Sequence, residues 1–69
     1  MTRWRVRREA LGLSRSELAR LAHVSEDTLL RLERGEAVSD RTRSAVEAVL
    51  GLLEAERAER VRVAMQHGA

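Results

Sequence analysis

Two short, capped helical segments separated by a very short turn constrain this chain more than any other feature. Ser14 is followed three residues later by Glu17, the pattern of a capping box at the start of a helix. Ser25 precedes two acidic residues that suit a second helix start, and Gly35 stands where a left-handed cap ends that helix. Only residues 22–24 separate the two segments. The sequence therefore predicts a tightly turned helix pair.

The apolar residues of this pair fall at the three- and four-residue spacing that places side chains on one helix face. We expect one buried seam made of Leu18, Leu21, Val24, Leu29 and Leu32. The outward positions of the second segment are then Glu26, Asp27, Leu30, Arg31 and Arg34. A short helix presented in this way fits the major groove of DNA, which is about 12 Å wide.

The rest of the chain is also predicted to be helical, because proline is absent and no strand-like alternation occurs. We expect a first helix over residues 2–11, with Trp4 and Leu11 on its core side. A loop over residues 36–40 leads to a helix that covers Asp40 to Leu50 and is capped by Ser39.

Residues 52–66 favour a further helix through their Ala, Glu, Arg and Leu content. Gly51 either ends the preceding helix or only softens it, and the last three residues are expected to fray. We divide the chain into a domain over residues 1–51 and a C-terminal helical extension over residues 52–69. The extension docks on its own domain, continues the preceding helix, or pairs with its copy in a dimer.

Length and composition exclude several function classes. The 69 residues contain no cysteine, and neither His23 nor His67 has the neighbours of a metal or catalytic site. We therefore expect no catalytic residue, no metal and no cofactor, and the chain is not expected to be an enzyme. No apolar stretch is long enough for a signal peptide or a membrane span, so no membrane contact is expected.

The charge is distributed unevenly along the chain. All 13 basic residues are arginine. Residues 1–35 hold eight arginines and five acidic residues, which gives +3, whereas residues 36–69 hold five and six, which gives −1. A basic front half and a nearly neutral back half suit a DNA-facing surface joined to a packing or assembly segment.

The chain resembles the Cro and repressor family of helix-turn-helix domains, the xenobiotic-response-element type, from Trp4 to Gly51. The matching residues are Gly12-Leu13-Ser14, Glu17-Leu18-Ala19, Val24-Ser25, Leu29 and Leu32-Glu33-Arg34-Gly35. The resemblance implies an all-α, compact, lambda-repressor-like bundle of four to five helices. It also implies transcriptional regulation on palindromic operators, with double-stranded DNA and a second copy of the chain as partners.

The resemblance further implies residue roles by position. Arg8 and Glu33 match an ion pair that ties the first helix to the end of the third. Positions that read base edges in the family are occupied here by Glu26, Asp27, Thr28 and Arg31. Positions that contact the DNA backbone are occupied by Arg15, Arg34 and Arg41.

Some positions depart from the family pattern. His23 replaces the usual turn glycine, which predicts slight strain at a positive φ. Glu26 and Asp27 bring two acids to the expected reading face, where they accept from cytosine N4 or serve only the helix dipole. Arg31 either contacts guanine or pairs with Asp27 on its own helix. Leu30 meets a thymine methyl group or a protein surface.

We therefore expect a sequence-specific DNA-binding regulator of repressor type, cytoplasmic and associated with the nucleoid. The alternative is an antitoxin subunit or a protein-interaction module that binds a partner protein through the same fold.

Overall fold

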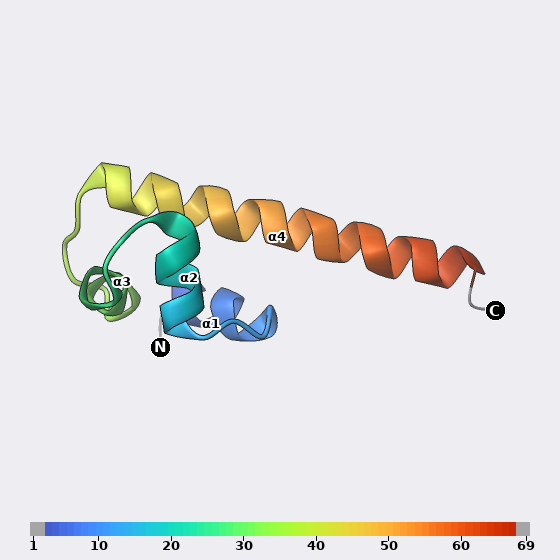
Figure 1. Ribbon diagram of the computed structural model, residues 1–69, viewed down its shortest axis with the longest axis horizontal. Coiled ribbons are helices and arrows are strands. Elements are labelled where there is room, and N and C mark those ends of the chain that lie inside the picture. Colours follow the sequence, from blue (N-terminus) through green and yellow to red (C-terminus); the bar gives the residue numbers. More distant parts are fainter. Residues whose placement is uncertain (1–2, 68–69) are drawn as a thin grey trace.

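The computed structural model describes residues 3–67, and this range contains four helices and no strand. The helices are α1 (Arg3–Ala10), α2 (Arg15–Ala22), α3 (Glu26–Glu33) and α4 (Asp40–His67). Figure 1 shows the first three gathered against the first half of α4, while the second half extends away from them. The molecule is accordingly elongated, with extents of 46 × 21 × 17 Å. The all-α expectation is confirmed.

The helix starts follow directly from serine side chains. Ser14 Oγ accepts the Glu17 N–H at 3.0 Å, and Glu17 Oε1 accepts the Ser14 N–H at 2.9 Å, which completes the capping box. The hydrogen bond that the Ser14 backbone N–H donates to the Glu17 carboxyl is the main cause that lowers the pKa of this carboxyl. Ser25 and Ser39 each accept the backbone N–H three residues further on, at 3.0 and 3.1 Å. All three predicted caps are confirmed.

The turns on either side of α3 use the left-handed backbone region. Gly35 has φ of 81°, and the N–H that follows it, of Glu36, donates to the Arg31 carbonyl at 2.9 Å, which closes α3. His23 caps α2 with φ of 57°. An L-residue with a Cβ reaches this region at a cost of about 1–2 kcal/mol. The predicted strain at His23 therefore has its backbone basis.

The core joins α2, α3 and the first half of α4. Its fully buried side chains are Leu18, Leu29, Val46 and Leu50, together with the nearly buried Leu32, Ala19 and Ala22. Trp4 and Leu11 of the α1 region pack against this cluster, as expected. Each buried leucine contributes about 1.5–3 kcal/mol relative to an exposed one.

The expected burial of Leu21 is wrong, since this side chain is 44% exposed. The buried face of α2 is centred between Leu18, Ala19 and Ala22. At about 100° per residue, Leu21 lies roughly 100° away from that centre. Val24, also placed in the seam, is half-buried and packs against the core.

The two helices expected after residue 39 are one continuous helix, so the alternative in which the extension continues the preceding helix is confirmed. Gly51 lies inside α4, where helix-forming neighbours outweigh a penalty of about 1 kcal/mol. Every residue from 55 to 67 is exposed. His67 is still helical, contrary to the expected fraying, whereas the expected helix start at residue 2 and residues 68–69 lie outside the described range.

Candidate nucleic-acid interface

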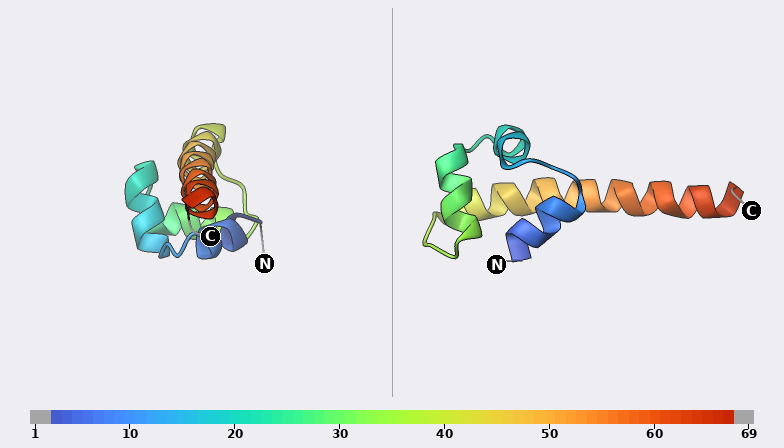
Figure 2. Two further views of the ribbon diagram at one scale, coloured as in Figure 1. Left: turned by 90° about the vertical axis from the view of Figure 1, so that its right-hand side faces the viewer. Right: turned by 90° about the horizontal axis from the view of Figure 1, so that it is seen from below.

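Helices α2 and α3 form the predicted turned pair, with only residues 23–25 between them. Figure 2 shows α3 at the end of the molecule opposite the C-terminal end of α4. Leu29, Leu32 and Glu33 are its buried residues. The remaining side of α3 faces solvent and carries most of the residues expected to read DNA.

A buried ion pair fixes the C-terminal end of α3 to α1. Arg8 Nε and Nη2 donate to the two oxygens of Glu33 at 2.7 and 3.1 Å, and Arg8 Nη1 donates to the Leu13 carbonyl at 2.9 Å. The residues are only 7% and 5% exposed. The hydrogen bonds that Arg8 donates to Glu33 raise the pKa of Arg8 further above its ordinary value. The pair expected from the family resemblance is therefore formed, and it is bidentate.

Arg15 lies against the same carboxylate. Its Nε donates to Glu33 Oε1 at 3.4 Å, and its side chain is 34% exposed. Only Nε is engaged in this contact, so the two terminal nitrogens remain as donors. Glu33 thus connects α1, the first residue of α2 and the end of α3.

The four residues expected to read bases lie in the first two turns of α3. Glu26, Asp27 and Arg31 are exposed, whereas Thr28 is half-buried and its Oγ1 accepts the Ser25 hydroxyl at 2.7 Å. Within residues 3–67 the ion-pair partner of Arg31 is Glu36, at 3.9 Å, and not Asp27. Arg31 is therefore a half-exposed, weakly paired cation on the outer side of α3.

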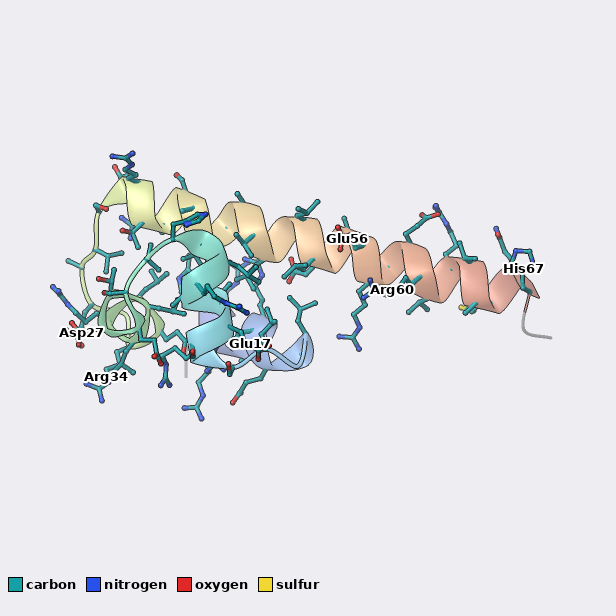
Figure 3. All side chains as sticks on the ribbon, viewed as in Figure 1. Glu17, Asp27, Arg34, Glu56, Arg60 and His67 are labelled. Carbon is teal, nitrogen blue, oxygen red and sulfur yellow. The ribbon has the colours of Figure 1, made fainter. Side chains whose placement is uncertain are left out.

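The expected backbone contacts Arg34 and Arg41 follow the end of α3 and the start of α4. Both side chains are exposed, and neither guanidinium has an ion-pair or hydrogen-bond partner among residues 3–67. Figure 3 shows Asp27 and Arg34 together on the outer side of α3. Cations of this kind are available to phosphate.

A polar hollow beside α3 was not predicted from the sequence. It is lined by Thr28, Arg31, Ala37, Val38, Ser39 and Thr42. Ser39 was expected only as a cap, and its hydroxyl also donates to Thr42 Oγ1 at 3.0 Å. The start of α4 therefore borders the same surface as Arg31. The signal available in the sequence was the short loop that joins the two helices.

Arg7 makes a second clamp that sequence reasoning missed. It donates to Glu47 at 2.6 and 3.0 Å and to Glu54 at 2.7 and 2.9 Å, so it holds α1 against α4 with two bidentate contacts. The guanidinium also lies 5.8 Å from the centre of the Trp4 ring. These hydrogen bonds raise the pKa of Arg7 and lower those of Glu47 and Glu54.

Among residues 3–67, no group of three or more His, Cys, Asp or Glu side chains is placed to hold a metal ion. None of the helices in this range combines the length and the apolar character that crossing a membrane requires.

A compact bundle that presents one short, capped helix of a turned pair to solvent defines a helix-turn-helix domain of the DNA-binding type. A comparison with protein families agrees, since residues 2–63 match a family described as "Helix-turn-helix domain". The chain belongs to this family. No curated protein and no solved structure gave a significant match.

Proposed function

We propose that this protein is a sequence-specific regulator of transcription that binds double-stranded DNA through α3. The observation that carries the proposal is the solvent side of α3. It bears Arg31 and is followed by Arg34 and Arg41, cations without a partner among residues 3–67, and the helix is held in place by the buried Arg8–Glu33 pair. A rigid, short helix of this kind fits the major groove.

Specific contacts follow from the chemistry of the exposed side chains. Arg31 is a half-exposed guanidinium whose fork matches O6 and N7 of guanine. Glu26 and Asp27 accept from N4 of cytosine, and Thr28 suits either base type. Because these two carboxylates repel phosphates, they weaken binding to arbitrary sequences more than binding to an operator with cytosine at the right positions.

Backbone contacts supply the affinity. Arg15, Arg34 and Arg41 neutralise phosphates, and Arg15 does so with the terminal nitrogens that its contact with Glu33 leaves open. Holding Nε against Glu33 limits the freedom of the Arg15 side chain, so less conformational entropy is lost on binding. The Arg15 contact would couple DNA binding to the pair that positions α3.

The regulator acts as a homodimer in the cytoplasm, associated with the nucleoid, and without enzymatic activity. Two copies would read two half-sites whose centres lie one turn of the double helix, about 34 Å, or a multiple of it apart. A symmetric protein matches a palindromic operator, and two-fold dimers are the commonest oligomers of soluble proteins.

The test is selection of bound fragments from a random DNA pool, followed by titration of the recovered sequence at two salt concentrations. We expect an enriched palindrome and an affinity that falls steeply with salt. The Arg31→Ala variant should lose discrimination at one position, at a cost of about 1–3 kcal/mol. The Arg34→Ala variant should weaken all sequences alike and reduce the salt slope by about 1.

The matched control is Arg62→Ala, which removes an arginine from the second half of α4. This variant should leave the affinity of one helix-turn-helix bundle for DNA unchanged. Absence of any enriched sequence, together with equal binding by the wild-type chain and Arg31→Ala, would contradict the proposal.

A second candidate, an antitoxin subunit or protein-interaction module, is favoured by the acidic pair Glu26 and Asp27 on the exposed side of α3. In that case a basic protein surface, and not DNA, would cover this side. Stoichiometric co-purification with a partner, combined with DNA binding no better than to random sequence, would support this function over the first.

A further inference from the structure

Within residues 3–67, the second half of α4 is held to α1 near its start, where Glu54 binds Arg7 and Arg57 donates to the Ala10 carbonyl, and it projects beyond these contacts. Residues 55–67 are all exposed, and Leu52 and Val63 are 61% and 41% exposed. A helical segment of this length is only marginally stable in water without packing. Covering its apolar side chains with another molecule would stabilise it.

One side of this segment is already occupied by α1. Arg7 contacts Glu47 and Glu54, so α1 lies along the face of α4 that carries these two carboxylates. A groove continues along that face, lined by Ala10 at the end of α1, by Leu11 just after it and by Val61 of α4. A second helix running past residue 54 on this side would meet α1.

The opposite side of α4 is exposed beyond the bundle, whereas Leu53, where this side begins, is half-buried. At 3.6 residues per turn, residue 56 lies about 200° around the helix axis from Glu54. We call this side the outer face, and it consists of Leu52, Leu53, Glu56, Arg60, Val63 and Ala64. Figure 2 shows that no other helix lies beside α4 beyond the bundle, and Figure 3 places Glu56 and Arg60 on that projecting part.

The outer face is complementary in charge and apolar character to a second copy of itself that runs in the opposite direction. Reflection about residue 58 exchanges Glu56 with Arg60, and it exchanges Leu53 with Val63. Every charge therefore meets the opposite charge, and every apolar side chain meets another apolar one. The other charged residues of the segment, Glu54 with Arg62 and Arg57 with Glu59, follow the same inversion in sequence, but they lie outside the outer face and do not meet across the pair.

We propose that the outer face of α4 binds the outer face of a second copy in an antiparallel pair whose two-fold axis passes near residue 58. Glu56 of each copy then meets Arg60 of the other, between two apolar layers formed by Leu53 and Val63. The two helix-turn-helix bundles lie at opposite ends of the paired helices. This inference rests on the homodimer of the proposed function, but it does not require DNA.

Charge selects this arrangement over its rivals. A parallel pair in register would place Glu56 against Glu56 and Arg60 against Arg60. An antiparallel pair with its two-fold axis at residue 56 would place Glu56 against Glu56 of the second copy, and an axis at residue 60 would place Arg60 against Arg60. Opposite charges across a helix pair set the orientation and the choice of partner, and like charges oppose it.

The test is the mass of the chain in solution without DNA, measured by sedimentation velocity over a range of concentrations. The wild-type chain should form a species of twice the 7.8 kDa monomer mass. The single variants Glu56→Arg and Arg60→Glu each place like charges in both interhelical contacts. Each should weaken dimerisation about tenfold or more.

Mixing the two variants is the decisive step. A heterodimer of Glu56→Arg with Arg60→Glu has opposite charges in both contacts, so dimerisation should recover to near the wild-type level. Loss of helix stability cannot explain such a recovery, because both variants keep like charges within their own helix. Circular dichroism of each variant checks that α4 remains helical.

Arg62→Glu is the matched control for Arg60→Glu. It makes the same change two residues further along, about 200° around the helix and away from the outer face. Dimerisation should stay within about twofold of wild type. An equal loss in Arg62→Glu and Arg60→Glu, or a mixture that stays monomeric, would overturn the proposed face.

Orientation is tested with a spin label on Gln66→Cys, since the chain has no other cysteine. The antiparallel pair separates the two labelled positions by 16 residues, about 24 Å along the axis. A short distance would show a parallel pair and overturn the inference. A monomeric wild-type chain would also overturn it and would leave the outer face to a different protein, whether or not the chain binds DNA.

Discussion

The bundle and the second half of α4 are both helical, but they are held in place by different forces. In the bundle, buried leucines and a buried ion pair fix three short helices that would not be stable alone. Beyond residue 54 the helix continues with residues 55–67 all exposed. Its ion pair Glu59–Arg62 is local, and Arg57 near its start donates to the Ala10 carbonyl of α1. Substitutions in the bundle should therefore change folding stability, whereas substitutions beyond it should mainly change association.

The largest difference is expected from removing an acidic partner of arginine in each region. Glu33→Ala leaves Arg8 buried without its carboxylate, and we expect a loss of about 3–5 kcal/mol in the free energy of unfolding. Glu59→Ala removes the partner of an exposed arginine and should cost less than about 0.5 kcal/mol. Urea denaturation followed by circular dichroism measures both, and equal losses would contradict the distinction between the regions.

Apolar truncation on the same helix should give the next largest contrast. Leu50 is fully buried at the level of the bundle, and Leu50→Ala should destabilise the fold by about 2–5 kcal/mol. Met65 is 78% exposed, so Met65→Ala should leave the unfolding free energy nearly unchanged. The measurement is thermal unfolding at low protein concentration, and a clear loss in Met65→Ala would show that the second half of α4 packs on the bundle.

These contrasts involve features that local sequence reasoning predicts well. The caps at Ser14, Ser25 and Ser39 and the left-handed Gly35 depend on neighbours within about four residues, and all are found in the structure. Leu21 was misplaced because a three-residue spacing alone does not fix the centre of the buried face. The centre of the buried face depends on where α3 and α4 pack against α2.

Contacts between distant segments could not be predicted from spacing. The carboxylates that Arg7 binds lie 40 and 47 residues further along the chain. Arg15 was expected to contact the DNA backbone and Arg31 to contact guanine or pair with Asp27, and the structure places these arginines beside Glu33 and Glu36. The Arg8–Glu33 pair was expected only because of the family resemblance, since no local sequence pattern indicates that these two residues are partners.

Acid should weaken the clamp that Arg7 makes between α1 and α4. Hydrogen bonds from Arg7 lower the pKa of Glu47 and Glu54 from the ordinary 4.5, so these carboxylates stabilise the folded state above about pH 4.5. That contribution is lost as the pH falls through their lowered pKa values. The melting temperatures of wild type and of the double variant Glu47→Gln/Glu54→Gln should therefore converge below pH 4.5.

Glu59→Gln is the control for this experiment, since it removes a carboxylate from the part of α4 that does not touch α1. The difference in melting temperature between Glu59→Gln and wild type should change little over the same pH range. If the melting temperature of the double variant stayed below that of wild type by the same amount at every pH, the assigned role of the clamp would be contradicted.

The smallest expected effects concern two glycines. A Cβ at Gly51 would meet only Glu47 Oε2, at 4.0 Å, so Gly51→Ala should stabilise α4 by roughly 0.5–1 kcal/mol where the two regions join. Gly12 has φ of 73°, so Gly12→Ala should destabilise the bundle by about 1–2 kcal/mol. Urea denaturation measures both changes, and a loss in Gly51→Ala would indicate that α4 needs flexibility at this point.

Trp4 gives the molecule an optical reporter of its own. It is the only tryptophan, and the chain has no tyrosine, so the near-ultraviolet emission comes from this single ring. The ring packs against the core and lies near the Arg7 guanidinium. Its emission should therefore follow the docking of α1 onto the bundle and remain insensitive to the distal part of α4. Fluorescence and far-ultraviolet circular dichroism together would separate melting of the bundle from unwinding of the projecting helix in one sample.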